Sequence, residues 1–549
     1  MTVRYSVLER DVILSRFKSE QYDLLVIGGG ITGAGIALDA ASRGLKIALV
    51  EKNDFAFGTS SRSTKLIHGG LRYLKQLEFG LVKEVGSERA VVHNLAPHLV
   101  VPEKMLLPLY EKKGLGYWLT SIGLRVYDWL AGVKREDQRK MLTRLQTLRY
   151  EPLLKKDDVK GGAIYAEYRT DDARLTMEIV KTAVRFGADV LNYVKVNDFI
   201  YEQNIIRGVQ VHDQLNNQVF TIAAQVTVSA AGPWVDELRQ VNRSLQGKRL
   251  HLTKGVHVVV PHAKFPVRQA IYFDVEDGRM IFAIPRGRIT YIGTTDTTYT
   301  GSVDRVTTSR EDAEYLVRAV NATFPKADLK LSDLESSWAG LRPLIHEDGK
   351  SASELSRKDE IFESPTGLIS IAGGKLTGYR KMAERVVNLV VKKHFPEKKL
   401  KSCHTQNLRL PGADFTGNKS IRNYTQKVFK RLKPLGFSFY MAKYLVENYG
   451  KQTDEILGQY ETFAHESKPE LALLKAELTF TVHHEMVATL QDFFVRRTGL
   501  LYFDIEKITR WKQDIADQLR QMLHWDDQKL EQELKALDVL VKEATEFNG

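Results

Sequence analysis

The residues with the clearest chemical meaning are three glycines near the start of the chain, in the pattern Gly28-x-Gly30-x-x-Gly33. The pattern follows one apolar run, and Glu51 closes the next. In this setting Gly28 permits a tight turn, Gly30 lets a pyrophosphate approach the backbone, and Gly33 lets a helix pack closely on a strand. A helix N-terminus supplies free N–H groups for phosphates, and a carboxylate such as Glu51 accepts hydrogen bonds from a ribose. The spacing predicts a dinucleotide site.

The glycine pattern alone leaves both NAD and FAD open as the cofactor. Three later segments favour FAD: the hydroxyl-rich stretch Thr59–Ser63, and the strand-to-glycine junctions at Ala230–Trp234 and Gly373–Thr377. Such junctions, although far apart in sequence, converge on one long cofactor when they lie at the carboxyl ends of a sheet. The Gly374-Lys375 pair is not a P-loop, because a leucine follows where Ser or Thr is required.

Several segments resemble, in order along the chain, the FAD-linked glycerol-3-phosphate dehydrogenases, a family of D-amino-acid-oxidase-like flavoproteins. They are Lys65–Leu74, Asp171–Leu175, Ala231–Trp234, Lys254–His257, Ile292–Asp296, Gly340–Leu344 and Gly373–Thr377. The resemblance implies an α/β fold: a Rossmann-like FAD domain with an inserted antiparallel-sheet substrate domain and a C-terminal α-helical domain.

The same resemblance implies how the domains divide the chain. The FAD domain is expected to be discontinuous and the substrate-binding cap to be inserted into it. The expected ranges are 20–100, 165–245 and 335–400 for the FAD domain, 101–164 and 246–334 for the cap, and 401–549 for the helical domain.

The implied reaction is oxidation of sn-glycerol 3-phosphate to dihydroxyacetone phosphate, by hydride transfer to flavin N5, with the electrons passed to a membrane quinone. A sister group, the glycerol-3-phosphate oxidases, passes them to oxygen and makes hydrogen peroxide. Those oxidases carry a long central insertion that this sequence lacks, which favours the dehydrogenase. A related FAD amine oxidase is a further alternative and predicts a carboxylate-binding site instead.

A dianionic phosphate ester requires a rigid basic pocket, which guanidinium groups suit better than ammonium groups. Arg72, Arg342 and Arg357 are the candidates, with Tyr73 and Lys375 as hydrogen-bonding support. By resemblance, Arg342 lies nearest the substrate oxygens, where it stabilises developing alkoxide charge.

His257 is the expected general base, since an unshifted imidazole titrates near working pH. It lies in a strand pattern, Gly255–Val260, so a hydrogen-bonded core histidine is the alternative. The residues expected to contact FAD are Gly28, Gly30, Ile31, Thr32, Gly33, Glu51, Lys52, Thr59, Ser60, Ser61, Lys65, Leu66, His68, Gly69, Gly232, Gly340, Gly374, Leu376 and Thr377.

Other reactive side chains have simpler interpretations. His483-His484-Glu485 lacks the i, i+4 histidine spacing of a zinc motif and is expected on a solvated helix, and no metal site is expected elsewhere. Arg496 and Arg497 are expected to serve the helical domain or a surface. The single cysteine, Cys403, fits a reducing compartment and is expected to be inert.

The elements that must position these residues follow from the apolar pattern. A buried strand over Tyr22–Ile27, a helix over Ala34–Ala41 capped by Gly44, and a strand over Ile47–Val50 form one βαβ unit. Beyond it we expect a helix over Asp171–Arg185 and then short strands. These are Val190–Val194, Gly208–His212, Val219–Ala223, Val226–Ser229, Gly255–Pro261, Met280–Ile284 and Thr290–Gly293.

The bulk composition limits partners and location. At 549 residues the chain is expected to hold two to four domains. Its net charge of +12 suits an anionic substrate or an anionic membrane face; because the charges are dispersed, no nucleic-acid partner is expected. The segment Gly114–Val133 is expected to be a packed helix, with an interfacial helix as the alternative. We expect a cytoplasmic protein that associates peripherally with the inner membrane face through a quinone or lipid surface, with a homodimer as one option.

Overall fold

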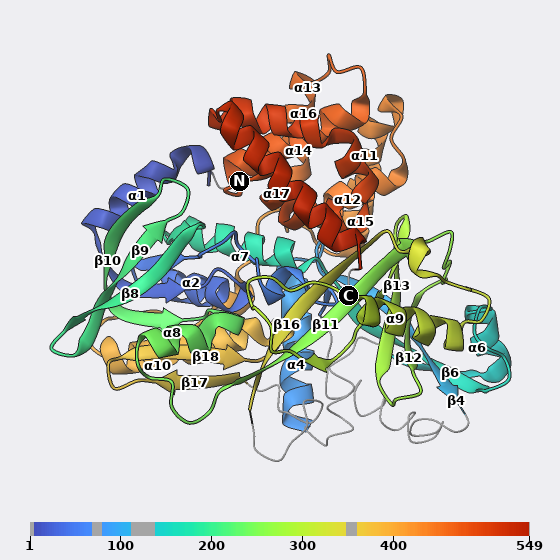
Figure 1. Ribbon diagram of the computed structural model, residues 1–549, viewed down its shortest axis with the longest axis horizontal. Helices are drawn as coiled ribbons and strands as arrows, with labels where there is room; N and C mark the ends of the chain where they lie inside the picture. Colours follow the sequence, from blue (N-terminus) through green and yellow to red (C-terminus); the bar gives the residue numbers. More distant parts are fainter. Residues whose placement is uncertain (1–4, 68–78, 111–137, 347–358, 548–549) are drawn as a thin grey trace.

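The structure is a computed structural model that describes residues 5–67, 79–110, 138–346 and 359–547. The described strands form two sheets, one on each side of the molecule in Figure 1, and the helices of the C-terminal part, drawn in orange and red, lie above both. The segment Gly114–Val133, and with it the choice between a packed and an interfacial helix, lies outside the described residues.

The first sheet, sheet A, has a parallel centre in the order β18-β10-β1-β2-β7. Strand β17 pairs antiparallel with β18, and β9 links β10 to β8. The bounds are β1 (Gln21–Ile27), β2 (Ile47–Val50), β7 (Asp189–Leu191), β8 (Val194–Glu202), β9 (Ile205–Asp213), β10 (Gln218–Ser229), β17 (Asp359–Glu363) and β18 (Leu368–Gly373).

The predicted βαβ unit is confirmed. Helix α2 (Ile31–Arg43) follows β1 and ends at Gly44, whose φ of 108° is the left-handed conformation of a C-terminal cap. It packs between α7 (Asp172–Arg185) and α10 (Tyr379–His394). The other α-helices that the structure describes outside the C-terminal part are α1 (Arg10–Ser19), α4 (Phe79–Leu95), α6 (Arg144–Tyr150), α8 (Val235–Val241) and α9 (Arg310–Thr323).

Strand β10 differs from the prediction of two separate strands, Val219–Ala223 and Val226–Ser229. It is one continuous strand that changes partner along its length. Its first half pairs antiparallel with β9 and its second half parallel with β1. The sequence pattern is interrupted at this change of partner, although the backbone stays extended.

The second sheet, sheet B, is mostly antiparallel, as predicted for residues 252–295. One face packs on the C-terminal helices and the other on α9. Its strands are β3 (Leu66–Ile67), β4 (Val101–Tyr110), β5 (Lys140–Thr143), β6 (Val159–Arg169), β11 (Leu250–Pro261), β12 (Ala270–Asp274), β13 (Met280–Arg286), β14 (Ile289–Gly293), β15 (Thr297–Thr298) and β16 (Ser336–Ile345). Strand β16 pairs with β11 although it belongs to the range 335–400 of the expected FAD domain, and the division into domains stays a proposal.

The C-terminal part is helical, as predicted. Its helices are α11 (Asn418–Leu432), α12 (Phe439–Tyr449), α13 (Thr453–Thr462), α14 (Pro469–His484), the π-helix η10 (Asp492–Arg497), α15 (Leu500–Phe503), α16 (Ile505–Leu523) and α17 (Asp527–Thr545). Within the described ranges, we find no helix with both the length and the hydropathy of a membrane span.

Candidate active site

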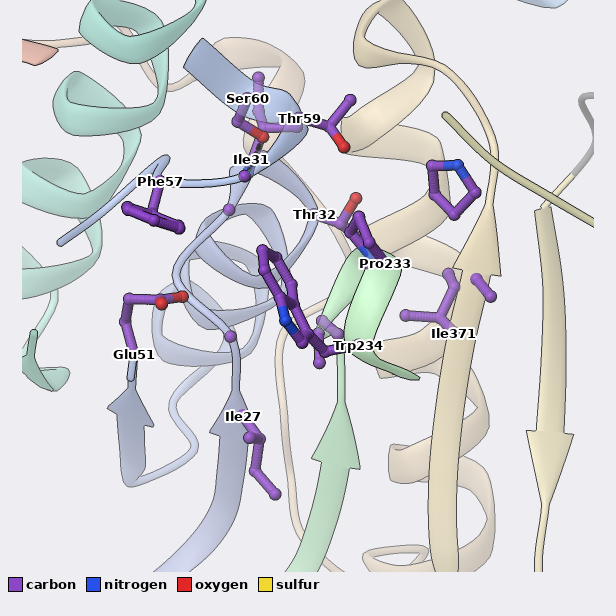
Figure 2. Close-up of a pocket in the computed structure, with 18 of the residues that line it drawn as sticks. Ile27, Ile31, Thr32, Glu51, Phe57, Thr59, Ser60, Pro233, Trp234 and Ile371 are labelled. Atoms are coloured by element: carbon purple, nitrogen blue, oxygen red, sulfur yellow. Dashed lines mark hydrogen bonds between the residues drawn. The ribbon is translucent and has the colours of Figure 1, made fainter. Parts of the chain in front are cut away.

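A cavity lies at the carboxyl ends of β1, β2, β10 and β18 (Figure 2). Five stretches of chain line it, within residues 27–32, 51–63, 194–196, 230–238 and 371–376, together with Pro343 and Met382. The strand-to-glycine junctions that the sequence singled out therefore meet at one edge of sheet A. This is the edge at which parallel α/β sheets bind their ligands.

The glycines of the first junction are required by close contacts. Gly28 has a φ of +111°, and a side chain on Gly33 would lie 1.9 Å from the carbonyl oxygen of Gly28. Around Gly30, by contrast, the nearest atom to an added Cβ is the Ser60 hydroxyl, at 3.3 Å. The turn is thus tight where β1 meets α2 and open toward the cavity, as a phosphate-binding turn requires.

Glu51 directly follows β2 and holds the turn from the opposite side. Its carboxylate accepts hydrogen bonds from the backbone N–H of Gly29 (2.7 Å) and of Asn53 (2.9 Å). Burial raises the pKa of Glu51, and these two backbone donors partly offset that effect. The carboxylate lines the cavity and also fixes the glycine turn.

The hydroxyl-rich segment connects the turn to sheet B. The Ser60 hydroxyl accepts a hydrogen bond from the Ile31 N–H, at the start of α2 (3.0 Å). The Thr59 hydroxyl donates to the carbonyl of Leu341 in β16 (2.7 Å). Both hydroxyl groups therefore lie between the cofactor turn and the strand that carries Arg342.

Many of the predicted contact residues meet at the cavity, and the predicted substrate residue Lys375 lies there too. Those that line it are Gly28, Gly30, Ile31, Thr32, Glu51, Lys52, Thr59, Ser60, Gly232, Gly374, Lys375 and Leu376. Those described but not lining it are Gly33, Ser61, Lys65, Leu66, Gly340 and Thr377. His68, Gly69, Arg72, Tyr73 and Arg357 lie outside the described residues.

Two of the residues that do not line the cavity have other partners. Lys65 is buried, and its ammonium group pairs with Asp172 at 2.5 Å and donates to the carbonyl of Ser61. Gly340 lies against Arg62, where an added Cβ would come within 2.5 Å of the backbone oxygen. Both support the segment after the hydroxyl cluster from outside the cavity.

Sequence reasoning missed part of the cavity wall. Phe57 and Trp234 lie in the lining (Figure 2), and the Lys52 ammonium group lies 4.3 Å from the centroid of the Trp234 ring. Trp234 belongs to the segment Ala231–Trp234, which carries part of the family resemblance, so the sequence could have identified it as a cavity residue. The lining stretch Val194–Val196 opens β8, and the sequence contains no signal for it because only the fold brings it there.

Arg342 lies on β16, one residue before Pro343 of the cavity wall. Its guanidinium donates to the Thr295 carbonyl (3.1 Å) and the Thr294 hydroxyl (3.0 Å), and it pairs with Asp296 at 3.0 Å. These contacts hold the guanidinium in place. Because the side chain is 23% exposed, part of it remains accessible.

His257 does not fit the expectation of an unshifted imidazole. It is buried, stacks on Trp338 with the ring centroids 4.7 Å apart, and its Nε2 lies 3.0 Å from the Thr64 hydroxyl. Burial, with smaller effects from Arg342 and Lys65, lowers the pKa of His257 well below its usual value. These contacts favour the alternative of a packed core histidine, and the role of general base stays a proposal.

One prediction for the C-terminal part is wrong, and a second is only partly correct. Glu485 is not on a solvated helix but buried, where its carboxylate pairs with Arg174 of α7. Arg496 and Arg497 do serve the helical part, where they bind Asp492 and the Glu485 carbonyl, but neither lies at a surface. Both also pair with Asp54, which lies outside the helical part. The sequence could not reveal these partners, because they lie hundreds of residues away.

Comparison with known proteins agrees with this geometry. The family model described as FAD dependent oxidoreductase matches residues 23–379. The chain belongs to this family. Residues 403–530 match the model described as C-terminal domain of alpha-glycerophosphate oxidase. The aerobic glycerol-3-phosphate dehydrogenase of Bacillus subtilis is 49% identical over 548 residues, 99% of each chain, and that of Staphylococcus haemolyticus is 47% identical, over 99% of this chain and 98% of its own.

Solved structures show the same relationship. A glycerol-3-phosphate dehydrogenase from Bacillus halodurans, complexed with FAD, has 44% identity and a TM-score of 0.84 over 99% of both chains. An L-alpha-glycerophosphate oxidase from Mycoplasma pneumoniae is 17% identical with a TM-score of 0.55, covering 70% of this chain and 96% of its own, and shares the fold.

The cavity of this family member fits FAD. The first-turn N–H groups of α2 point to its edge, where glycine leaves room for a pyrophosphate. Ile27, Trp234 and Ile371 supply apolar surface beside these polar groups. A cradle that an added Cβ would fill, with both polar and apolar walls, suits a long cofactor that has a phosphate centre and flat rings.

Proposed function

We propose that the protein oxidises sn-glycerol 3-phosphate to dihydroxyacetone phosphate and passes the electrons to a quinone. The observation that carries the proposal is identity of 49% along 99% of the chain with the aerobic glycerol-3-phosphate dehydrogenase of Bacillus subtilis. A cavity built from five converging stretches, with the features of an FAD site, supports it.

In this proposal the residues of the protein bind and orient the cofactor and the substrate. Bound FAD supplies the hydride acceptor. The first-turn N–H groups of α2 and the hydroxyl of Ser60, which keeps its own proton, would hold the phosphates, and Glu51 would accept hydrogen bonds from the ribose. Apolar lining residues such as Ile371 exclude water from one side of the cavity.

The substrate groups are assigned by charge and rigidity. Arg342 and Lys375 bind the substrate oxygens, together with Arg72, Tyr73 and Arg357. Because Arg342 is already fixed by Thr294, Thr295 and Asp296, it needs little reorganisation to stabilise a developing alkoxide. His257 is neutral near pH 7, because its pKa is lowered, so its imidazole is in the form that accepts the C2 hydroxyl proton.

Anaerobic mixing of the purified holoenzyme with sn-glycerol 3-phosphate tests the proposal. The visible absorbance of the flavin is expected to bleach with this ester and to persist with glycerol at the same concentration. The difference isolates the need for the phosphate group. Bleaching by an amino acid instead would assign the protein to the amine oxidases.

The electron acceptor separates a dehydrogenase from an oxidase. The oxidase is the second candidate, because residues 403–530 match the C-terminal domain of alpha-glycerophosphate oxidase. After reduction by the substrate, a soluble quinone is expected to restore the flavin spectrum much faster than air. Rapid reoxidation by oxygen with stoichiometric hydrogen peroxide would favour the oxidase.

Location and assembly complete the proposal. We place the protein in the cytoplasm, at the inner face of the membrane, because its reduced form must meet a quinone and its net charge of +12 suits anionic lipid. A homodimer stays an open proposal, and sedimentation velocity of the holoenzyme decides it.

A further inference from the structure

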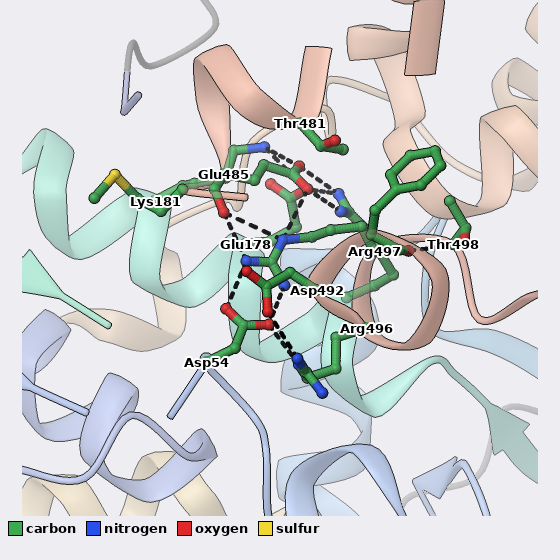
Figure 3. A network of polar contacts seen from close by, with 12 residues as sticks. Asp54, Glu178, Lys181, Thr481, Glu485, Asp492, Arg496, Arg497 and Thr498 are labelled. Carbon is green, nitrogen blue, oxygen red and sulfur yellow. Dashed lines mark hydrogen bonds and ion pairs between the residues drawn. The ribbon is translucent and has the colours of Figure 1, made fainter. Parts of the chain in front are cut away.

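A buried network of charges joins the C-terminal part to the rest of the molecule (Figure 3). At its centre is the π-helix η10, which carries Asp492 at its start and Arg496 and Arg497 at its end. All three side chains are at most 4% exposed. Desolvating so many charges is costly unless each is paired and hydrogen-bonded, so the network imposes a specific arrangement.

One branch of the network reaches the segment that follows Glu51. Arg497 binds Asp54 through two parallel hydrogen bonds, both 2.8 Å, and Arg496 pairs with the same carboxylate. Burial alone would raise the pKa of Asp54, but Arg497 and Arg496 outweigh it and lower the pKa to about 2. A two-pronged guanidinium contact fixes both the position and the orientation of a carboxylate. Asp54 therefore cannot shift without breaking these bonds.

A second branch reaches the stretch that opens β8. The Tyr193 hydroxyl donates to Asp492 at 2.5 Å, and the residue has a φ of 58°. Its backbone N–H donates to the carbonyl of Asn53, and the next N–H, of Val194, donates to the carbonyl of Glu51, each at 2.8 Å. The two branches therefore hold two neighbouring stretches of chain. The first lines the cofactor cavity from Phe57 onward, and the second lines it from Val194 onward.

We propose that Asp54 and Tyr193 are positioning residues through which η10 holds the cofactor cavity in its binding shape. FAD affinity then depends on the docked C-terminal helices, none of which lines the cavity among the described residues. This role goes beyond the proposed reaction and does not depend on the identity of the substrate.

The test measures FAD affinity directly. The full-length holoenzyme and the variants Asp54→Asn and Tyr193→Phe are stripped of flavin, and FAD is titrated back while its fluorescence is followed. Both variants are expected to weaken FAD binding by about tenfold or more, because the support of a binding segment is lost. Arg497→Lys, which keeps the charge but loses the two-pronged contact, is expected to fall between Asp54→Asn and the unchanged protein.

Glu447→Gln is the matched control. Glu447 of α12 pairs with Arg169 of β6 at 3.0 Å. The variant therefore also breaks an ion pair between the C-terminal helices and the remaining chain. Unlike the pairs of Asp54 and Tyr193, this one does not hold a stretch that lines the cavity. The variant is expected to lower the melting temperature while leaving the FAD dissociation constant unchanged.

Unchanged FAD affinity in both Asp54→Asn and Tyr193→Phe overturns the proposal. So does equal weakening in Glu447→Gln, since that result assigns the effect to general stability. If Asp54→Asn does not fold, Tyr193→Phe decides alone, because it removes one hydroxyl group and keeps the aromatic ring. The FAD titration needs no substrate, so its outcome is separate from that of the proposed reaction.

Discussion

Two residues of sheet B, His257 and Arg342, were expected to act together, and their surroundings differ sharply. His257 is 1% exposed and stacked on an indole ring, whereas Arg342 is 23% exposed with its guanidinium held on two sides. A buried neutral imidazole contributes packing in either role, but a fixed and accessible cation is suited to stabilise charge in a reaction. At the scale of single residues, Arg342 is the stronger candidate.

Arg342→Ala is expected to lower kcat by about 10²–10³-fold, the usual cost of removing a fixed group that stabilises an oxyanion. FAD binding should persist, because Arg342 itself is not among the cavity-lining residues. Steady-state turnover and the ratio of flavin to protein absorbance measure the two effects. Arg288→Ala is the control, since it breaks a pair with Glu335 in the turns beside sheet B, outside its strands. Near-normal turnover of Arg342→Ala would remove this residue from the mechanism.

His98 makes stability depend on pH. It is fully buried, and neither ring nitrogen has a hydrogen-bond partner among the described residues. Burial, then the charges of Arg174 and Lys181, lowers its pKa from 6.5 to about 3. A histidine whose pKa is lower in the folded state contributes stability that is present above pH 6.5 and is lost as the pH falls toward 3.

From this shift in pKa, the free energy of unfolding is expected to be about 2 kcal/mol lower at pH 5 than at pH 7. The melting temperature of the unchanged protein should fall over this range, and that of His98→Leu should fall less. His465→Gln, in an exposed loop, serves as the control and should keep the original slope. Identical slopes for all three proteins would rule out His98 as the source.

At the scale of elements, the contact between β1 and α2 determines whether a cofactor site exists. The strand and the helix approach so closely that only a glycine fits at position 33. The same approach directs the helix N-terminus at the cavity. Packing and binding are therefore two consequences of one contact.

Gly33→Ala is expected to yield protein without flavin, because its Cβ would lie 1.9 Å from the Gly28 carbonyl oxygen and would force the helix away from the strand. Gly458→Ala is the matched control, since this helical glycine of α13 has no atom within 4 Å of an added Cβ. The control should retain its flavin and gain about 0.5–1 kcal/mol from helix propensity. Absorbance spectra of the purified variants measure flavin content, and a fully loaded Gly33→Ala protein contradicts the argument.

At the scale of the whole molecule, the C-terminal helices are part of the main body. The helices from α14 to α17 share one hydrophobic core with sheet B, in which Trp338 and Phe503 lie with ring centroids 5.9 Å apart. They also reach the cofactor segments through Asp54 and Tyr193. Because both contacts are buried, we expect the helices and the two sheets to unfold together.

The net charge of +12 acts at the same scale. The protein is expected to sediment with vesicles that contain anionic lipid, and less so as salt increases, because dispersed surface charges are screened beyond about 10 Å at 0.1 M salt. Vesicles of neutral phosphatidylcholine are the control. Full retention in the supernatant with anionic vesicles at low salt would argue against the peripheral location.

The sequence by itself determined the local features: the glycine turn, β1, α2 and its cap, and the family to which their order points. These depend on neighbouring residues, whose spacing is visible in one dimension. Tertiary structure alone decided that Val194–Val196 lines the cavity, that Arg497 binds Asp54, and that His257 has a lowered pKa. Burial and charge pairing depend on groups hundreds of residues apart, and their energies arise only when the folded chain removes water from between them.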